Sequence, residues 1–247
     1  MKYMGSKSRI AKHILPIVFK NFEYGMTYVE PFVGGCNMID KTPKTTMPKL
    51  AFDINPHLIS MWNHLQKGWQ PPCEISRDYY SDVRRNYNEQ GEDYPSYETG
   101  YVGFSGSYGG RFFEGGYAGK STTKNGSVRN YPMEAYKNIE KQLPKVMDVE
   151  FECMNYKDID LLGLECVIYC DPPYRGTKEY AQTGFDSEDF WEWCDDQVEE
   201  GHQVFVSEYE APIGWDCVWE KEVSSSLRAN GVIEGDKKSV ERLFTKL

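Results

Sequence analysis

The sequence predicts an α/β protein built around one sheet, and three observations support this. Short apolar segments typical of buried strands alternate with segments whose apolar residues recur at helical spacing. Two of the strands end at loops rich in glycine or proline, where open sheets of this class commonly bind ligands. With 247 residues, the chain is long enough for a core domain that carries an insertion.

The N-terminal part of the chain predicts a helix and then a short strand. The helix begins after Ser6, with apolar residues at positions 10, 14, 17 and 18 on its inner face. Pro16 is expected to kink or shorten it, because proline removes a hydrogen bond from a helix interior. Tyr28 and Val29 form a strand that leads into the segment EPFVGGC, residues 30–36.

A second strand, at residues 50–52, ends at Asp53 and is followed by a capped helix. Asn55 offers a side-chain oxygen to the helix N-terminus, and Pro56 takes the first helical position, which proline favours. Apolar residues at positions 58, 59, 62 and 65 form the buried face of this helix, and Gly68 ends it.

The middle of the chain, residues 69–147, does not follow this alternation. It contains a stretch rich in Gly, Ser and Tyr without a long period, residues 94–131, and a helical pattern only near its end. The alternation resumes with a strand at residues 149–153. We therefore expect residues 1–68 and 148–247 to form the sheet domain, with residues 69–147 inserted as a smaller domain.

The C-terminal part predicts a helix and further strands. Residues 166–170, CVIYC, are an uninterrupted apolar run of the kind found in strands buried on both faces. Asp186 is placed to cap a helix that Gly201 ends. The later strands are expected at residues 204–206, 217–219 and 240–244.

The net charge of −10 is distributed unevenly. Residues 148–222 contain 4 basic and 21 acidic residues, a balance of −17, whereas residues 1–50 and 105–147 carry +5 and +4. Net negative charge by itself argues against a nucleic-acid partner, but two basic segments beside one acidic block are compatible with one. The acidic residues of the helix at 186–200 are expected to face solvent, away from such a partner.

Composition also excludes several classes of protein. The longest apolar runs are far too short to span a membrane, and no apolar segment typical of a signal peptide follows Met1. The seven cysteines include no Cys-x-x-Cys pair and the four histidines are scattered, so no metal site is expected. We expect a cytoplasmic protein with reduced cysteines.

The strongest functional signal is Asp171-Pro172-Pro173-Tyr174, directly after the strand at 166–170. The two prolines fix the backbone and lack N–H donors, so carbonyl groups of this loop stay free to accept hydrogen bonds. The Asp171 carboxylate, such a carbonyl and the Tyr174 ring suit a planar ring that carries an amine. A proline turn without function is the simpler alternative.

A second signal is the tight glycine turn within residues 30–36, since paired glycines allow a ligand to approach the backbone. The turn lacks the Gly-x-Gly-x-x-Gly pattern, which disfavours a nicotinamide dinucleotide. Asp53 ends the next strand, where an acidic residue commonly binds ribose hydroxyls. Together these features predict an adenosine-containing ligand without a critical phosphate.

The chain resembles the Dam-type, adenine-specific DNA methyltransferases over nearly its whole length. Four motifs occur in that family's order: YMGSK at 3–7, PFVGG at 31–35, DIN at 53–55 and DPPY at 171–174. The resemblance implies a Rossmann-like fold that uses S-adenosylmethionine, releases S-adenosylhomocysteine and needs no metal. It also implies that the insertion at 69–147 is the target recognition domain. Segments 207–209 and 239–244 also look similar.

The resemblance assigns roles to individual residues. The catalytic residues would be Asp171, Pro172, Pro173 and Tyr174. The cofactor would be contacted by Tyr3, Lys7, Pro31, Phe32, Gly34, Gly35, Asp53, Ile54, Asn155, Tyr156 and Asp171. Asn155 and Tyr156 stand where the family usually has Asp-Phe, and the Asn155 amide oxygen can still accept from the cofactor adenine. Tyr180 is expected to cover the cofactor.

The implied reaction is methyl transfer to the exocyclic N6 amine of an adenine in a specific duplex DNA sequence. Because this amine lies inside the base stack, the enzyme is expected to flip the adenine into its pocket. Hydrogen bonds from the amine to Asp171 and to the Pro172 carbonyl would draw the nitrogen toward tetrahedral geometry before it attacks the methyl group in line. Such an enzyme is expected in a bacterial or phage-infected cell, at the nucleoid.

Basic and aromatic residues alternate in the insertion, which predicts that it binds DNA. Basic side chains contact phosphates or guanine edges, and aromatic rings such as Phe112, Phe113 and Tyr117 can fill the gap that a flipped base leaves. The residues predicted to contact DNA are Tyr108, Arg111, Lys120, Lys124, Asn125 and Arg129. The glycines among them predict loops that become ordered only on DNA.

Other functions fit parts of the sequence. A methyltransferase for cytosine N4, or for adenine in RNA, would use the same fold, and only the aspartate of the catalytic motif favours adenine. A catalytically silent DNA-binding relative would not need Asp171, Tyr174, Lys7 and Asp53 to be intact. A nucleotide-dependent oxidoreductase would need the missing dinucleotide fingerprint. No nuclease motif is found, so we expect a stand-alone methyltransferase.

Overall fold

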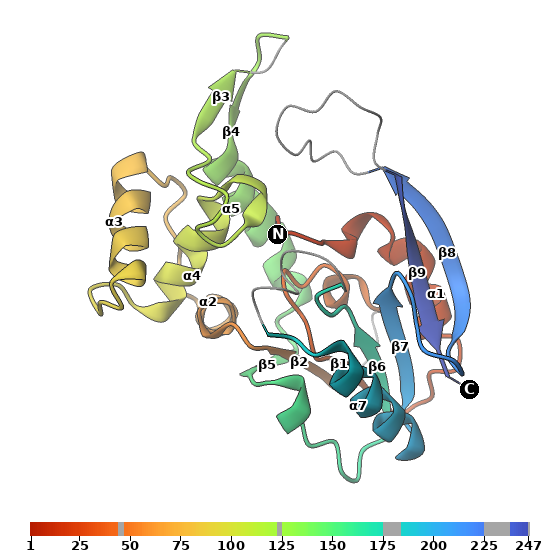
Figure 1. Ribbon diagram of the computed structural model, residues 1–247. Helices are drawn as coiled ribbons and strands as arrows, with labels where there is room; N and C mark the ends of the chain where they lie inside the picture. The colour runs from red at the N-terminus through yellow and green to blue at the C-terminus, as the bar shows by residue number, and fades with distance from the viewer. Residues whose placement is uncertain (44–46, 123–124, 175–183, 225–237, 247) are drawn as a thin grey trace.

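A computed structural model describes residues 1–43, 47–122, 125–174, 184–224 and 238–246. Seven strands form one sheet in the spatial order β5-β2-β1-β6-β7-β9-β8 (Figure 1). Their bounds are Thr27–Glu30 (β1), Lys49–Asp53 (β2), Val149–Cys153 (β5), Cys166–Cys170 (β6), Gln203–Glu208 (β7), Asp216–Ser224 (β8) and Lys238–Thr245 (β9). The first five strands in this order, β5, β2, β1, β6 and β7, are parallel, and β9 is antiparallel to β7 and β8. The predicted α/β, Rossmann-like fold class is confirmed.

Helices cover both faces of this sheet. Helices α1 (Ala11–Val18) and α2 (Pro56–Gln66) pack on one face and α7 (Ser187–Glu199) on the other. Side chains of each strand alternate between the two layers, because successive residues of a strand point to opposite faces. Val167 of β6 lies in the α1 and α2 core, and its neighbour Ile168 lies in the α7 core. The apolar run of β6 is thus buried on both sides, as its sequence predicts.

The predicted helix signals are confirmed. The Asn55 side chain accepts hydrogen bonds from the backbone N–H groups of His57 and Leu58, at 3.0 and 3.1 Å, and Pro56 opens α2. Asp186 caps α7 in the same way. Pro16 lies inside α1, which ends two residues later. Short 3-10 turns connect the larger elements: Lys7–Arg9 (η1), Ile39–Lys41 (η2), Tyr108–Gly110 (η3), Leu143–Lys145 (η4) and Tyr156–Asp158 (η5).

The inserted segment contains two helices that the sequence analysis did not predict. Its elements are α3 (Arg77–Asn88), α4 (Ser96–Ser105), β3 (Lys120–Thr122), β4 (Val128–Asn130) and α5 (Tyr131–Gln142). Helix α4 escaped prediction because seven consecutive residues, from Thr99 to Ser105, are buried, so no apolar stripe marks one face. A Cβ at Gly100 would lie 2.2 Å from the His57 carbonyl oxygen of α2. The glycine therefore allows close helix packing.

The insertion shares the hydrophobic core of the sheet. Tyr101, Val102, Phe104 and Phe113 belong to the same buried cluster as the apolar residues of α1 and α2. Part of the glycine-rich segment is therefore packed, whereas Gly109, Gly116 and Gly126 border open space. The expectation that its loops become ordered only on DNA stays a prediction.

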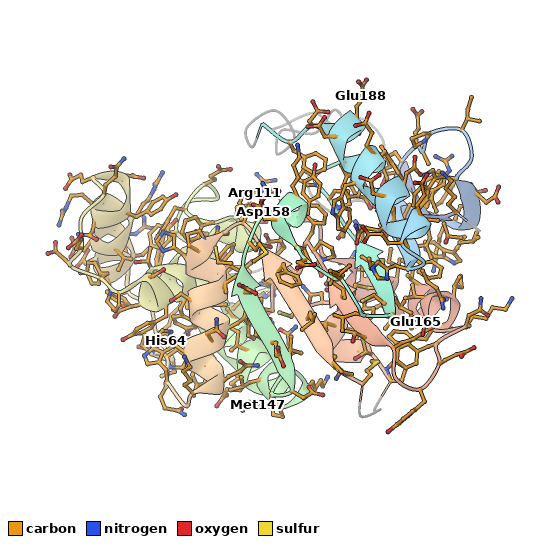
Figure 2. The ribbon with its side chains drawn as sticks, turned by 90° about the horizontal axis from the view of Figure 1, so that it is seen from below. His64, Arg111, Met147, Asp158, Glu165 and Glu188 are labelled. Atoms are coloured by element: carbon orange, nitrogen blue, oxygen red, sulfur yellow. The ribbon has the colours of Figure 1, made fainter. Side chains whose placement is uncertain are left out.

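The acidic face of α7 is exposed, as predicted. Glu188, Glu192 and Glu199 are among the six exposed acids of this helix and its C-cap, and Figure 2 shows Glu188 on the outer surface. Asp195 is half-buried, because its Oδ1 accepts a hydrogen bond from Trp215 Nε1 at 3.0 Å and pairs with Lys246 at 2.9 Å. In the described part of the chain, no helix has the length and apolar character needed to cross a bilayer.

The cap of α7 gives a stability prediction. Asp186 Oδ1 accepts from the backbone N–H groups of Glu188 and Asp189, at 2.8 and 3.2 Å. Asp186→Ala should lower the free energy of unfolding by about 1 kcal/mol, because it leaves two helix donors without this acceptor. Asp186→Asn retains the oxygen and should recover most of the loss in urea unfolding. Equal losses in both variants would contradict the capping role.

Candidate active site

The sheet topology brings the two predicted motifs to one edge. From β1 the chain continues to β2 and β5 on one side, and later to β6 and β7 on the other, so the strand order reverses between β1 and β6. Doubly wound sheets bind ligands beyond the carboxyl ends of the strands at such a point. The glycine turn follows β1 and Asp171 follows β6, so both lie at this position.

The turn after β1 packs closely against the N-terminal segment. Gly34 has a φ of 47°, in the left-handed region that favours glycine. A Cβ at Gly34 would lie 2.7 Å from the Tyr3 ring, and a Cβ at Gly35 would lie 2.6 Å from the Tyr3 Cβ. The structure thus brings together two predicted site segments, residues 3–7 and 31–35. The space left by the missing glycine side chains is occupied by Tyr3. Cys36 follows with a φ of 56° and is fully buried.

Asp53, at the end of β2, fixes the same turn. Its Oδ2 accepts from the Gly34 N–H at 3.0 Å, and its Oδ1 accepts from the Asn55 N–H at 2.9 Å. Burial raises the pKa of Asp53, and these two hydrogen bonds oppose the rise. Because each carboxylate oxygen can accept more than one hydrogen bond, Asp53 can still bind hydroxyl groups of a ligand.

Residues beside Asp53 divide between an open surface and the core. Ile54 is 66% exposed, which leaves an apolar side chain available to a ligand ring. The Asn155 side-chain oxygen accepts from the Lys157 N–H at 3.1 Å and so caps η5. Tyr156 is only 5% exposed, and its ring centroid lies 5.4 Å from that of Phe32. Its ring therefore belongs to the core below the turn.

A buried lysine connects the catalytic motif with the C-terminal strand. Lys7, 7% exposed, lies between two carboxylates: its Nζ is 3.2 Å from Asp171 Oδ1 and 3.3 Å from Glu241 Oε2. The Tyr174 hydroxyl donates to Glu241 Oε2 at 3.0 Å, and the Lys7 Nζ lies 4.4 Å from the centroid of the Tyr174 ring. We call these four residues the Lys7 network.

Charge within the Lys7 network sets the ionisation of its members. Burial raises the pKa of Asp171 to about 6, although the Lys7 ammonium opposes this rise and the Glu241 carboxylate adds to it. Burial lowers the pKa of Lys7, but the carboxylates of Asp171 and Glu241 outweigh it and the net pKa is raised. At neutral pH the network therefore holds an ionised Asp171 beside a charged Lys7.

The loop itself is less open than its sequence suggests. Tyr174 is buried, with the Lys7 ammonium over its ring and the Tyr209 ring against it at 4.7 Å, edge to face. Pro172 is buried and Pro173 is half-buried. In this structure the Tyr174 ring is part of the Lys7 network, which limits the surface that it offers for stacking.

Glu241 is a site residue that the sequence analysis did not single out. It lies in β9, which pairs with β7 such that Ser207 is opposite Leu243 and Glu208 is opposite Arg242. This pairing brings a residue from the end of the chain beside the motif at the end of β6. The local signal was weak, because Glu241 is followed directly by Arg242 in a strand of mixed polarity.

The structure places most of the predicted DNA-binding residues on the surface of the insertion. Five of them are described and exposed: Tyr108, Arg111, Lys120, Asn125 and Arg129. Lys124 lies outside the described residues, as does Tyr180. Of the neighbouring aromatic residues, Phe113 is buried, whereas Tyr108 is 54% exposed.

Lys120, Asn125 and Arg129 lie on or next to the β3–β4 hairpin, which projects from the molecule (Figure 1). Arg111 follows η3 and is not part of this hairpin. The Arg129 Nε donates to Glu134 Oε1 at 2.9 Å, and its guanidinium lies 4.8 Å from the Tyr131 ring centroid. The hairpin therefore carries exposed basic groups, one of which is already held by α5.

The sequence family described as "D12 class N6 adenine-specific DNA methyltransferase" matches residues 3–213. The chain belongs to this family. This methyltransferase transfers a methyl group from S-adenosylmethionine to the N6 amine of adenine in DNA. The predicted family, activity and cofactor are thereby confirmed, and the alternatives of cytosine N4, RNA, oxidoreductase or silent function receive no support.

Named relatives are also adenine methylases. Retron Ec67 DNA adenine methylase from Escherichia coli is 26% identical over 228 residues, 84% of this chain and 75% of that protein. DNA adenine methylase from Vibrio cholerae serotype O1 is 26% identical over 213 residues, 76% of this chain and 72% of that protein. The crystal structure of SMU.472 complexed with SAH aligns with 97% of this methyltransferase but 52% of its own chain, at 12% identity and a TM-score of 0.37, too weak a likeness for any inference.

The Lys7 network gives a prediction for the ionisation of Asp171. Glu241→Gln should lower the pKa of Asp171, because it removes a neighbouring negative charge, and Lys7→Met should raise it, because it removes the positive one. The carboxyl carbon shift of labelled Asp171, assigned with Asp171→Asn, measures both changes by NMR. Glu220→Gln, an exposed acid of β8, is the control and should change nothing. Shifts of the same sign in the two test variants would contradict the network.

Proposed function

We propose that the methyltransferase acts on an adenine flipped out of duplex DNA and held at the loop of residues 171–174. The amine of a paired adenine is inaccessible inside the stack, so the base must leave the helix to react. The Asp171 carboxylate accepts one hydrogen of the amine, and the Pro172 carbonyl accepts the other. These bonds draw the nitrogen lone pair out of conjugation with the ring and orient it for attack.

The observation that carries this proposal is the ion pair between Lys7 and Asp171 at 3.2 Å. An acceptor for an amine hydrogen must be ionised or present a free lone pair, and Lys7 favours the charged form of a carboxylate that burial disfavours. With a pKa of about 6, Asp171 is ionised at neutral pH. Methyl transfer should accordingly decline as the pH falls through 6.

The residues at the carboxyl edge of β1, β2 and β5 fit the cofactor. Asp53 retains acceptor capacity for ribose hydroxyls, Ile54 presents an exposed apolar surface to the adenine ring, and Asn155 lies beside them. The turn with Gly34 and Gly35 faces the methionine portion, with Tyr3, Lys7, Pro31 and Phe32 around it. S-adenosylmethionine supplies the methyl group, and the chain supplies binding and orientation.

We assign recognition of a specific duplex sequence to the insertion, residues 69–147. Its β3–β4 hairpin carries Lys120, Asn125 and Arg129, and Tyr108 and Arg111 lie nearby on η3 and its C-cap. Basic groups on a projecting hairpin suit contacts with phosphates and base edges. The bacterial source of the relatives supports action in the cytoplasm of a bacterial or phage-infected cell.

Asp171→Ala should reduce methyl transfer to duplex DNA by on the order of a thousandfold, because the amine loses its charged acceptor. Labelled methyl transfer followed by nucleoside analysis measures the rate and identifies the base. The matched control is Asp148→Ala, which also breaks an ion pair with a buried lysine, Lys49 at 2.8 Å. Lys49 begins β2, so this pair lies at the edge of the sheet opposite the candidate site. An unaltered rate in folded Asp171→Ala protein would refute the assignment.

Charge reversal of Arg111, Lys120, Lys124 and Arg129 together should weaken DNA binding and flatten its dependence on salt. Each lost phosphate contact should reduce the slope of log affinity against log salt by about 0.9. Reversal of three exposed lysines outside the insertion, Lys12, Lys20 and Lys67, is the control and should leave the slope unchanged. An equal salt slope in the two variants would refute the assignment of these residues to the DNA interface.

A further inference from the structure

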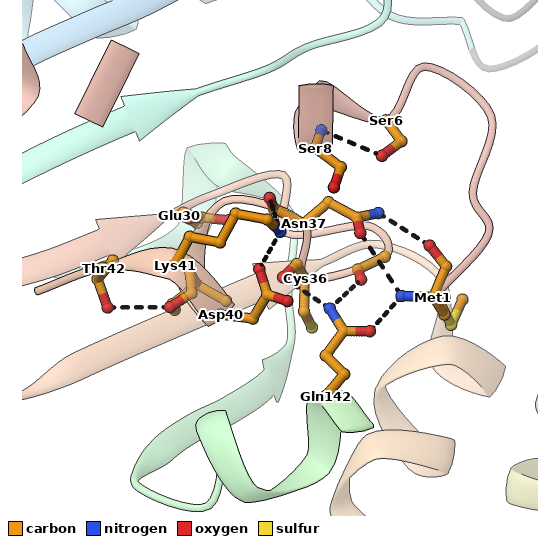
Figure 3. Close-up of polar contacts among 12 residues, drawn as sticks. Met1, Ser6, Ser8, Glu30, Cys36, Asn37, Asp40, Lys41, Thr42 and Gln142 are labelled. Atoms are coloured by element: carbon orange, nitrogen blue, oxygen red, sulfur yellow. Dashed lines mark hydrogen bonds and ion pairs between the residues drawn. The ribbon is translucent and has the colours of Figure 1, made fainter. Parts of the chain in front are cut away.

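We propose that Gln142 is a positioning residue that holds the turn of residues 34–36 in shape and ties it to the insertion. Gln142 is the last residue of α5 and is 3% exposed. Its Nε2 donates to the carbonyl oxygens of Gly35 and Cys36, at 3.0 and 2.9 Å (Figure 3). The inference rests on the proposed function, in which this turn faces the cofactor.

The turn requires such support because of its backbone. Cys36 has a φ of 56°, a left-handed conformation that is unfavourable for a residue with a side chain. Strained conformations persist only where the surroundings fix them. In addition, buried carbonyl groups need hydrogen-bond donors. One buried amide group, that of Gln142, supplies donors to two consecutive carbonyls at the strained position.

Two parts of the chain thus fix the turn from different sides. Asp53 of β2 accepts the Gly34 N–H, and Gln142 of α5 donates to the carbonyls of Gly35 and Cys36. Asp53 is also placed to contact the cofactor directly. Gln142 makes its two donor bonds to the backbone of the turn, so it acts on the cofactor through the position of that backbone.

The location of Gln142 links the turn to the hairpin. Helix α5 begins at Tyr131, directly after β4 (Val128–Asn130), and ends at Gln142. At 1.5 Å per residue, its twelve residues span about 18 Å. A single helix therefore connects the hairpin, which we assign to DNA contact, with the turn, which we assign to the cofactor.

A matched control exists in the same fold. Gln66, at the end of α2, donates through its Nε2 to the carbonyl oxygens of Val146 and Val149, at 2.6 and 2.8 Å. These bonds have the same chemistry as those of Gln142 but lie away from the turn. Gln66→Met therefore removes an equivalent pair of donor bonds, none of them to residues 34–36. Gln142→Met additionally removes the bond that Gln142 Oε1 accepts from the Met1 ammonium.

The experiment compares Gln142→Met with Gln66→Met in two measurements. The first is alkylation of Cys36 in cofactor-free protein, followed by peptide mass spectrometry, with buried Cys170 as an internal reference. The second is the affinity for S-adenosylhomocysteine, measured by calorimetry. Because Gln142→Met removes both donor bonds to the turn, alkylation of Cys36 should become about tenfold faster or more, and S-adenosylhomocysteine should bind about tenfold more weakly or more. Gln66→Met should match the wild type in both.

Equal Cys36 alkylation in the two variants, or equal ligand affinity, would overturn the inference. Gln142→Asn, whose amide is too short to reach both carbonyls, provides the same comparison if Gln142→Met does not fold. Asp53→Ala separates this inference from the proposed function. If Asp53→Ala weakens binding and Gln142→Met does not, the positioning role alone fails. If Asp53→Ala leaves binding unchanged, the proposed cofactor site fails.

Discussion

The buried ammonium of Lys7 is the constraint on which the arrangement of the candidate active site depends. Removing a lysine from water is costly unless oppositely charged groups lie within contact distance. Asp171 and Glu241 meet that need at 3.2 and 3.3 Å. They come from the end of β6 and from β9, whereas Lys7 comes from η1, so one charge requires three distant parts of the chain to meet. Removal of either carboxylate would leave part of that cost uncompensated.

The insertion is integrated with the sheet domain through a shared core. Helix α4 lies so close to α2 that only glycine fits at position 100. Tyr101 and Phe104 join the apolar cluster of α1 and α2, and Tyr3 packs against Phe104 with ring centroids 5.5 Å apart. Interiors packed at this density transmit displacement. The insertion and the turn after β1 are therefore connected through one continuous packed core.

Local signals in the sequence were sufficient for the sheet and for most of the site. Asn55 and Asp186 act through neighbours two or three residues away, and the buried run of β6 reflects its own burial, so all three can be read from short segments. The resemblance at motif level supplied Lys7, Asp53 and Asp171 as site candidates. These motifs were recognisable because their chemistry is concentrated in a few adjacent residues.

What the sequence did not reveal depends on contacts between distant segments. Helix α4 is buried on nearly all sides, so its surroundings rather than its periodicity define it. Glu241 becomes part of the site only through the pairing of β9 with β7, and Gln142 only through the packing of α5 beneath the glycine turn. Glu241 lies in segment 239–244, which resembles the family only as a whole, and Gln142 lies in no motif, so neither residue is marked individually.

The acidic surface of α7 has a consequence for how the molecule meets a polyanion. Helix α7 covers one face of the sheet, and the α2 layer, on which the insertion packs, covers the other. Residues 148–222 carry −17, whereas residues 105–147, which include the hairpin, carry +4, so negative charge is concentrated on the part of the chain that contains α7. The field of a nucleic acid acts on these charges within about a Debye length, 8 to 10 Å at moderate salt. With the hairpin assigned to DNA as proposed, repulsion of the acidic α7 surface disfavours approach of the duplex to that face and reduces the number of unproductive encounters.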